Sequence, residues 1–365
     1  MSTESVSTDP GPTDLADREP PTGDTVDVAA GRPTREWFLY VYSAAITTAS
    51  VVLIMRLWRA NTSVPFFSSG DAAISAGYFK NISLTGWITG QANLGVPFGQ
   101  QSADLVSPGL LNPVLARIVS AVFSDWALAF NLFFLGGFVA SALTGVWFFR
   151  CVGLGRWMAV VASVLLAIAP YHFIQNQNEI WLSAYFCVPL GLVLILRVTR
   201  GEPLWGRRGS GNRAAAWLGG RGAGTAVILV LLAFDGAPYA LFTGLLLAVG
   251  GAVGLARRFA LTRLVGLIAA EAVLVVGFLV DALPHLLRPA VSGPTTALVK
   301  AASVELTEIK FAALVFPSPG QPIAFFAKWR GLYDAHFPIP GDTPALGLVA
   351  AAGFALLRLV PREQR

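Results

Sequence analysis

Charged side chains are scarce in this sequence. They make up 13% of the 365 residues, whereas 55% are hydrophobic; soluble domains carry roughly 25% charged residues. A membrane-spanning helix needs about twenty mostly apolar residues. Lipid offers the backbone no hydrogen-bond partners, so helices are the default spanning structure. The composition therefore predicts an all-α, polytopic membrane protein.

Residues for several kinds of chemistry are also few. Cys151 and Cys187 fall at a predicted cytoplasmic helix end and inside a predicted span, so no extracytoplasmic disulfide is expected. The three histidines are too scattered for a His-x-x-x-His zinc site, and the chain has neither a Gly-Lys-Ser/Thr phosphate loop nor a Gly-x-Gly-x-x-Gly fingerprint. These absences argue against ATP-driven transport and nucleotide-cofactor redox chemistry.

The apolar runs predict about eight spans in one transmembrane domain, residues 37–365. A Pro-, Asp- and Thr-rich tail, residues 1–36, precedes it and is expected to be disordered in the cytoplasm. The predicted spans are Trp37–Trp58, Trp126–Phe149, Trp157–Phe173, Ile180–Leu196, Ala216–Phe234, Tyr239–Leu255, Leu264–Leu283 and Thr343–Leu357. Around Asp235, two short spans with a tight outer turn fit better than one broken helix.

The distribution of basic residues predicts the orientation. Fourteen arginines fall in the four segments assigned to the cytoplasm, whereas the much longer outer segments hold eight basic residues. The positive-inside rule then places both termini in the cytoplasm of a bacterial plasma membrane. The first outer loop, residues 59–125, and the last, residues 284–342, are the largest segments outside the spans.

Acidic residues gather on the predicted outer side. Outside the tail, ten of thirteen lie in outer segments or at the outer end of a span. Asp71 opens an expected interfacial helix with Ile74, Tyr78 and Ile82 on one stripe. A second such helix is expected from Leu110 to Phe123, with Leu111, Leu115, Ile118 and Val122 on one side. Asp71 is either the N-cap of its helix or a catalytic base, and the two roles are compatible.

The order of motifs in this chain resembles the GT-C superfamily of membrane glycosyltransferases, most of all bacterial YfhO-like proteins. The first outer loop carries Gly70-Asp71, Trp87, Asn93-Leu94-Gly95-Val96-Pro97 and Asp104. Further likeness lies in Ala169-Pro170-Tyr171-His172-Phe173, Leu182-Ser183-Ala184-Tyr185-Phe186, Val188-Pro189-Leu190, Gly236 with Tyr239 and Phe242-Thr243, and Glu305, Glu308 and Lys310 before Phe316-Pro317.

The resemblance implies an enzyme that transfers a sugar from a polyprenyl-phosphate donor to a glycan, lipid or protein acceptor outside the membrane. In that family an acidic residue of the first outer loop acts as base or metal ligand, and the matching position is Asp71. No cofactor is firmly indicated. A divalent cation stays an open alternative, although the loop has no Asp-x-Asp pair to hold one.

Other candidate substrate-binding residues each have a second interpretation. His172 and Glu179 flank a polar turn that contacts a donor headgroup or is simply solvated. Asp235 faces Asp71 or breaks a helix. Glu305 and Glu308 bind substrate or lie on a solvated face. The remaining substrate-binding candidates are Asp104 and Lys310.

Two alternatives to the transferase stay open. The first is a transporter or flippase for a lipid-linked sugar, favoured by the helix break at Gly236 and by Glu271 inside a predicted span, where an ionisable group is costly. The second is a non-catalytic scaffold for envelope biosynthesis. Nucleic acid is not an expected partner.

Overall fold

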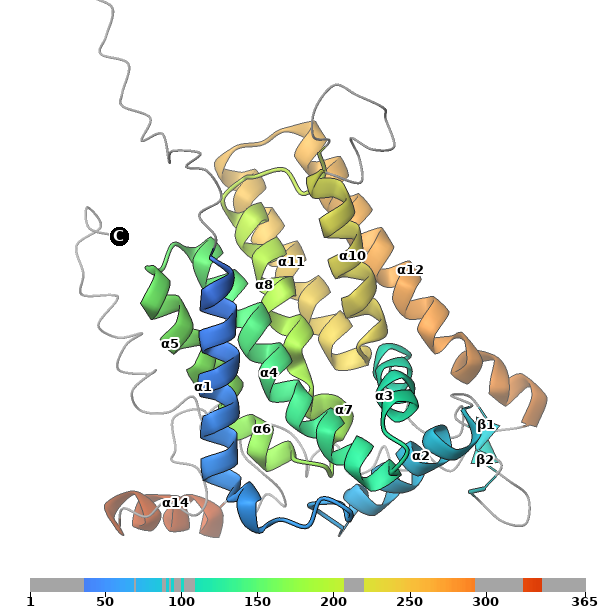
Figure 1. Cartoon of the computed structure of the whole chain (residues 1–365). Helices are drawn as coiled ribbons and strands as arrows, with labels where there is room; N and C mark the ends of the chain where they lie inside the picture. The colour runs from blue at the N-terminus through green and yellow to red at the C-terminus, as the bar shows by residue number, and fades with distance from the viewer. Residues whose placement is uncertain are drawn as a thin grey trace, which may run out of the picture.

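The computed structural model describes residues 36–292, except 69, 87–89, 92, 95–99, 102–108 and 207–219, together with residues 324–336. This part of the chain is helical apart from one antiparallel pair of two-residue strands (Figure 1). Its α-helices are α1 Trp37–Met55, α2 Asp71–Thr85, α3 Leu111–Val122, α4 Trp126–Val152, α5 Arg156–Ala167, α6 Pro170–Gln175, α7 Ile180–Ser183, α8 Val188–Thr199, α10 Arg221–Phe234, α11 Ala237–Arg257, α12 Leu261–Ser292 and α14 Ala324–His336. The strands are β1 Gly90–Gln91 and β2 Gln100–Gln101.

Six helical segments of the described chain are long and apolar enough to cross a membrane. Two of them are interrupted. The segment 156–175 bends between α5 and α6, where Pro170 begins a new helix, and the segment 180–199 passes from α7 through a 3-10 turn into α8. The helical class and the membrane character that composition predicted are thus confirmed. The predicted span 343–357 and the tail to residue 35 lie outside the described residues.

Helix α4 is the centre of the bundle and packs against α1, α5 and α8. One buried cluster gathers its phenylalanines, with Phe130 and Phe133 edge-on to Phe79 of α2. A second cluster joins α8, α10, α11 and α12 through leucines such as Leu194 and Leu232. Within the membrane, α1 and α5 are linked by a hydrogen bond between the hydroxyls of Ser43 and Ser163 at 2.8 Å.

Arginines gather at one end of the bundle. At the start of α1, Glu36 forms salt bridges with Arg150 and Arg156, at 3.1 and 3.2 Å. Arg200, just after α8, donates to the backbone carbonyls at the end of α4. Figure 1 shows these helix ends together at the top, whereas α2, the β1–β2 hairpin and the α6–α7 turn lie at the bottom.

Helices α10 and α11 form a hairpin around Asp235–Gly236, as the sequence favoured over one broken helix. Arg221 at the start of α10 pairs with Glu202 after α8, and Gly254 near the end of α11 packs on Val198 of α8. The ends of α10 and α11 that lie away from the Asp235 turn therefore meet at the same end of α8. The described part of the predicted span 216–234 is the 14-residue α10, shorter than a usual span.

The two helices predicted in the first outer loop exist, and each buries only part of its apolar stripe. In α2, Tyr78 and Ile82 are buried, whereas Ile74 is exposed. In α3, Ile118 and Val122 are exposed, and the face packed on α2, α4 and α10 contains Asn112 and Ser120. Each predicted stripe is thus partly buried and partly exposed. Lipid is as apolar as these side chains, so in a membrane protein they gain little by turning inward.

Gly109, just before α3, should tolerate no side chain. Its φ is +77°, and a Cβ there would lie 2.4 Å from the carbonyl oxygen of Phe234 and 2.6 Å from the backbone nitrogen of Gly236. The left-handed conformation alone costs about 1–2 kcal/mol. We expect Gly109→Ala to lower the thermal unfolding temperature in detergent strongly, because backbone must also move.

The matched control is Gly136→Ala on α4, where a Cβ meets no atom within 4 Å. It should unfold at or slightly above the wild-type temperature, since Ala favours helix over Gly by up to about 1 kcal/mol. Equal unfolding temperatures for the two variants would contradict this account of the α3–α10 contact.

Candidate functional site

A buried amide pair ties the first outer loop to the α6–α7 turn. Asn131 of α4 is 1% exposed. Its carbonyl oxygen accepts from the Gln177 amide at 2.9 Å and from the Phe66 N–H at 3.2 Å. Its amide donates to the carbonyls of Thr62 and Val64 at 3.0 and 2.8 Å. Residues 62–66 are therefore held against the end of α4.

The same turn caps α2. The Gln177 side-chain oxygen accepts from the Phe67 N–H at 3.0 Å. The Asn178 side-chain oxygen accepts from the Ala72 N–H at 3.1 Å, and its backbone carbonyl accepts from the Ser75 hydroxyl at 3.2 Å. The first turn of a helix has N–H groups without partners inside the helix. A residue 106 positions away in the chain supplies one of the missing acceptors.

Asp71 is the first residue of α2, and its side chain is exposed. The N-cap position belongs to Gly70, which has a φ of 60°. The interpretation of Asp71 as the N-cap is therefore wrong, because Asn178 accepts the hydrogen bond that such a cap would take. The positive end of the α2 dipole still favours a carboxylate at this position.

Glu179 lies beside Asp71 at the end of the α6–α7 turn. It is half-buried. Burial raises its pKa above the ordinary value, and the nearby charge of Asp71 raises it further. Both effects make the charged form of the Glu179 carboxyl group less favourable. We refer to Asp71 and Glu179 as the carboxylate pair.

His172 does not belong to this pair, and the prediction that places it at a polar turn is wrong. Its ring is fully buried and stacked on Phe138, with the centroids 3.5 Å apart and the planes at 6°. Gly137 makes room, because a Cβ there would lie 3.3 Å from the imidazole. The helix continues from Pro170 to Gln175, so the turn begins only at Asn176 and His172 faces the core.

Asp235 is also buried rather than facing Asp71. It is 1% exposed, and both its carboxylate and its backbone carbonyl accept from the Asn112 amide at 3.3 Å. Burial raises its pKa to about 7, although hydrogen bonds from Cys187 and Asn112 act in the opposite direction. Its interpretation as the break between two helices is the correct one. Asp104, Glu305, Glu308 and Lys310 lie outside the described residues.

Two cationic side chains between α1 and α4 lie at the far end of α2 from Asp71. Lys80 is nine residues further along the helix, about 14 Å at 1.5 Å per residue, and its ammonium lies over the Trp126 ring. The Arg117 guanidinium lies next to Gly86, which ends α2. Among the described residues, no three His, Cys, Asp or Glu side chains are grouped as a metal site.

Glu271 lies on α12 against α11. Its Oε2 would be 3.2 Å from a Cβ at Gly244, and its Oε1 is buried without a hydrogen-bond partner among the described residues. A cavity of about 510 Å³ between the two helices is lined by Glu271 and by apolar residues such as Leu241 and Phe278. A carboxyl group in such surroundings is costly unless it is protonated.

Sequence reasoning missed Asn131 and Asn178 as the residues that build the site. Asn131 had a visible signal, since it is a lone amide inside an apolar run and such a group needs partners when buried. Asn178 stood inside the polar turn that was singled out, but nothing in the sequence pairs it with Ala72. In comparisons with known proteins, the chain matches no family model, no curated protein and no solved structure.

The long-range cap of α2 can be tested with Asn178→Ala. Loss of a helix cap costs about 0.5–2 kcal/mol. We expect the first-turn amides of α2 to exchange hydrogen several-fold faster, as measured by hydrogen–deuterium exchange in detergent. Asn61→Ala, which removes only a local exposed bond to Ser63, is the control. Unchanged exchange in α2 for Asn178→Ala would show that the cap is not needed.

The buried Asp235 should make stability depend on pH. Its folded pKa of about 7 exceeds the ordinary value of 3.8, so the folded state binds more protons than the unfolded state between these values. Stability therefore falls as pH rises from about 4 to 7 and levels off above. Asp235→Asn should raise the unfolding temperature at pH 8 but have a much smaller effect at pH 5. The exposed Asp71→Asn, measured in the same way, should leave the trend intact.

Proposed function

We propose that this protein is an integral-membrane glycosyltransferase of the GT-C type. It transfers a sugar from a polyprenyl-phosphate donor to an envelope glycan, lipid or protein acceptor on the outer face of a bacterial plasma membrane. The observation that carries this proposal is the carboxylate pair, held by a network of polar hydrogen bonds at the end of the bundle opposite the arginines.

Asp71 acts as the base in this proposal. Its carboxylate is exposed to an acceptor arriving from outside and lies at the first turn of α2. A carboxylate within hydrogen-bond reach takes the proton of the acceptor hydroxyl as that oxygen attacks the anomeric carbon. Glu179, whose pKa is raised by burial and by the charge of Asp71, lies at the same place and contacts the substrate.

The orientation follows the arginines. Arg150, Arg156, Arg200 and Arg221 share one end of the bundle, and positively charged loops favour the cytoplasmic side. The carboxylate pair then faces outward, where polyprenyl-linked donors are used in the family that the motifs resemble. The leaving phosphate needs a cation, and the distances along α2 exclude Lys80 as an immediate neighbour of Asp71.

A transporter of lipid-linked sugars is the second candidate. The observation that favours it is Glu271, whose carboxyl group borders the apolar cavity between α11 and α12 within the membrane. Functional ionisable groups in transporters occupy such positions. If the protein is a transporter, Glu271 should be essential for function and Asp71 dispensable. If it is a transferase, Asp71 should be essential and Glu271 dispensable.

The deciding comparison uses cells that carry the wild-type chain, Asp71→Asn, Glu271→Gln or no chain. Envelope glycans and lipid-linked sugars are measured by mass spectrometry beside the protein level. We expect Asp71→Asn to remove one sugar decoration by at least 100-fold, as loss of a general base does, while its polyprenyl-phosphate donor accumulates. The control is Asp125→Asn in the same loop, where Asp125 caps α4 and Asn caps equally well.

Glycan profiles that change in Glu271→Gln and in the deletion, but not in Asp71→Asn, would replace the transferase by the transporter. Profiles that change only in the deletion would indicate a scaffold.

A further inference from the structure

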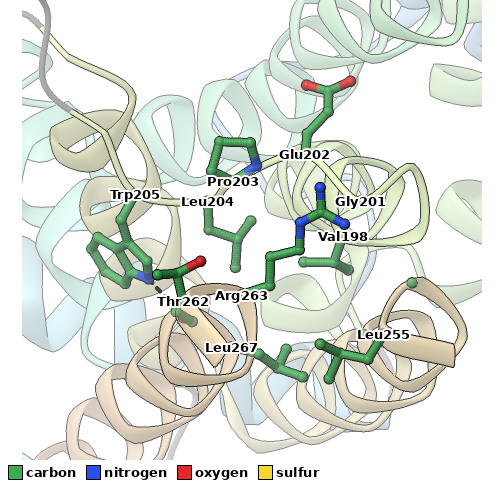
Figure 2. Close-up of a pocket in the computed structure, with 13 residues that line it drawn as sticks. Val198, Gly201, Glu202, Pro203, Leu204, Trp205, Leu255, Thr262, Arg263 and Leu267 are labelled. Carbon is green, nitrogen blue, oxygen red and sulfur yellow. Dashed lines mark hydrogen bonds between the residues drawn. The ribbon is translucent and has the colours of Figure 1, made fainter. Parts of the chain in front are cut away.

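A second site lies at the arginine-rich end of the bundle, far from the carboxylate pair. A cavity of about 130 Å³ opens there between the loop after α8, the end of α11 and the start of α12 (Figure 2). This volume accommodates several water molecules and hence a group the size of a phosphate. Its walls combine the Arg263, Thr262 and Trp205 side chains with the apolar Leu255 and Leu267.

Arg263 gives the cavity its charge. Figure 2 shows its side chain reaching from α12 into the middle of the pocket. One guanidinium nitrogen donates to the backbone carbonyl of Arg258 at 3.0 Å and lies about the same distance from where a Gly201 Cβ would be. Among the described residues Arg263 forms no salt bridge. The remaining N–H donors of its planar fork suit the oxygens of a phosphate.

The start of α12 adds a second cationic element. This 32-residue helix begins at Leu261, and Thr262 lines the pocket. The backbone N–H groups of Arg263 and Leu264 donate to the Ala260 carbonyl, so those of Leu261 and Thr262 are the ones that precede the first bonds of the helix. The positive dipole end of the helix favours an anion there. Glu202 also borders the cavity, but it is paired with Arg221 at 3.5 Å and its carboxylate points away from Arg263 in Figure 2.

The surroundings favour a lipid over a soluble phosphate compound. Phe259, Leu261 and Val265 flank the pocket residues in the chain and are 73%, 66% and 58% exposed. These side chains give acyl chains an apolar surface beside a phosphate-sized cationic pocket. Trp205, whose indole donates to the Gly266 carbonyl at 2.7 Å, is the kind of side chain that occupies the level of lipid headgroups.

We propose that this pocket binds the phosphate headgroup of an anionic phospholipid, with Arg263 and the N-terminus of α12 as its ligands. The bound lipid links α8, α11 and α12 at their common end. This role is independent of the proposed glycosyl transfer, because the pocket shares no residue with the carboxylate pair.

The test uses the full chain, purified in detergent, stripped of lipid and titrated with phosphatidylglycerol. Thermal unfolding gives the midpoint of the titration, and native mass spectrometry counts the bound lipids. We expect a saturable rise in unfolding temperature for the wild type. For Arg263→Gln, which keeps an amide donor for the Arg258 carbonyl, we expect a midpoint about tenfold higher, as loss of a charged hydrogen bond predicts.

Arg257→Ala is the matched control, because it removes a positive charge from the same end at an exposed position outside the pocket. Its midpoint should stay within about twofold of the wild type, as expected for a surface charge. Thr262→Glu gives a variant less liable to fold poorly, since an acid in the first turn stabilises a helix. Its negative charge in the pocket should weaken lipid binding at least as much as Arg263→Gln does.

Three results would overturn the proposal. The first is the same midpoint for wild type, Arg263→Gln and Thr262→Glu. The second is equal stabilisation by zwitterionic phosphatidylcholine, which would make the acyl chains rather than the headgroup responsible. The third is equal stabilisation by inorganic phosphate or glycerol phosphate, which would assign the pocket to a soluble ligand.

Discussion

The end of the bundle that carries Asp71 depends on one buried hydrogen-bond network, the amide pair of Asn131 and Gln177. A membrane bundle cannot leave such groups unpaired, because neither lipid nor the aromatic core around α4 offers a substitute partner. The pair therefore fixes residues 62–67 and the α6–α7 turn relative to each other. Asn178, one residue further, then reaches the start of α2. The position of Asp71 is thus set by α4 and by a turn more than a hundred residues away, not by its own loop.

The helical class followed directly from composition, and the bounds of α1, α4 and α11 lie within a few residues of the predicted spans. These spans are long, continuous and apolar, so their bounds can be predicted from hydropathy alone, without any analysis of helical periodicity. Burial was harder to predict. Ile118 and Val122 of α3 form an apolar stripe of the sort that packs inward in water, yet they are exposed while Asn112 is buried. In a membrane protein the expectation is different. Apolar side chains are equally stable when they face lipid, whereas polar side chains need hydrogen-bond partners within the protein and are therefore buried.

For the candidate site, too, some features could be predicted from the sequence and others could not. Its location at the arginine-poor end could be predicted from the distribution of acidic and basic residues, which is a property of the sequence alone. Which residues make up the site could not be predicted in this way. In the sequence, His172 and Asp235 are polar residues next to apolar runs, as Asp71 is. In the structure both are fully buried: His172 stacks on Phe138, and Asp235 accepts a hydrogen bond from Asn112. The hydrogen bond between Asn178 and Ala72, which are 106 residues apart, depends on how the helices pack in three dimensions. A single sequence does not specify that packing.

The two ends of the bundle carry opposite charges: two acidic side chains lie close together at one end, and arginines gather at the other. At one end, burial raises the pKa of Glu179, and the nearby charge of Asp71 raises it further. At the other end, Glu36 neutralises Arg150 and Arg156, and Glu202 neutralises Arg221. Arg263 forms no salt bridge within the described chain, although it borders a cavity beside exposed apolar residues. A partly desolvated guanidinium gains most from an anion whose oxygens fit its planar fork, and the phosphate of a membrane lipid is the counter-charge that we propose for it.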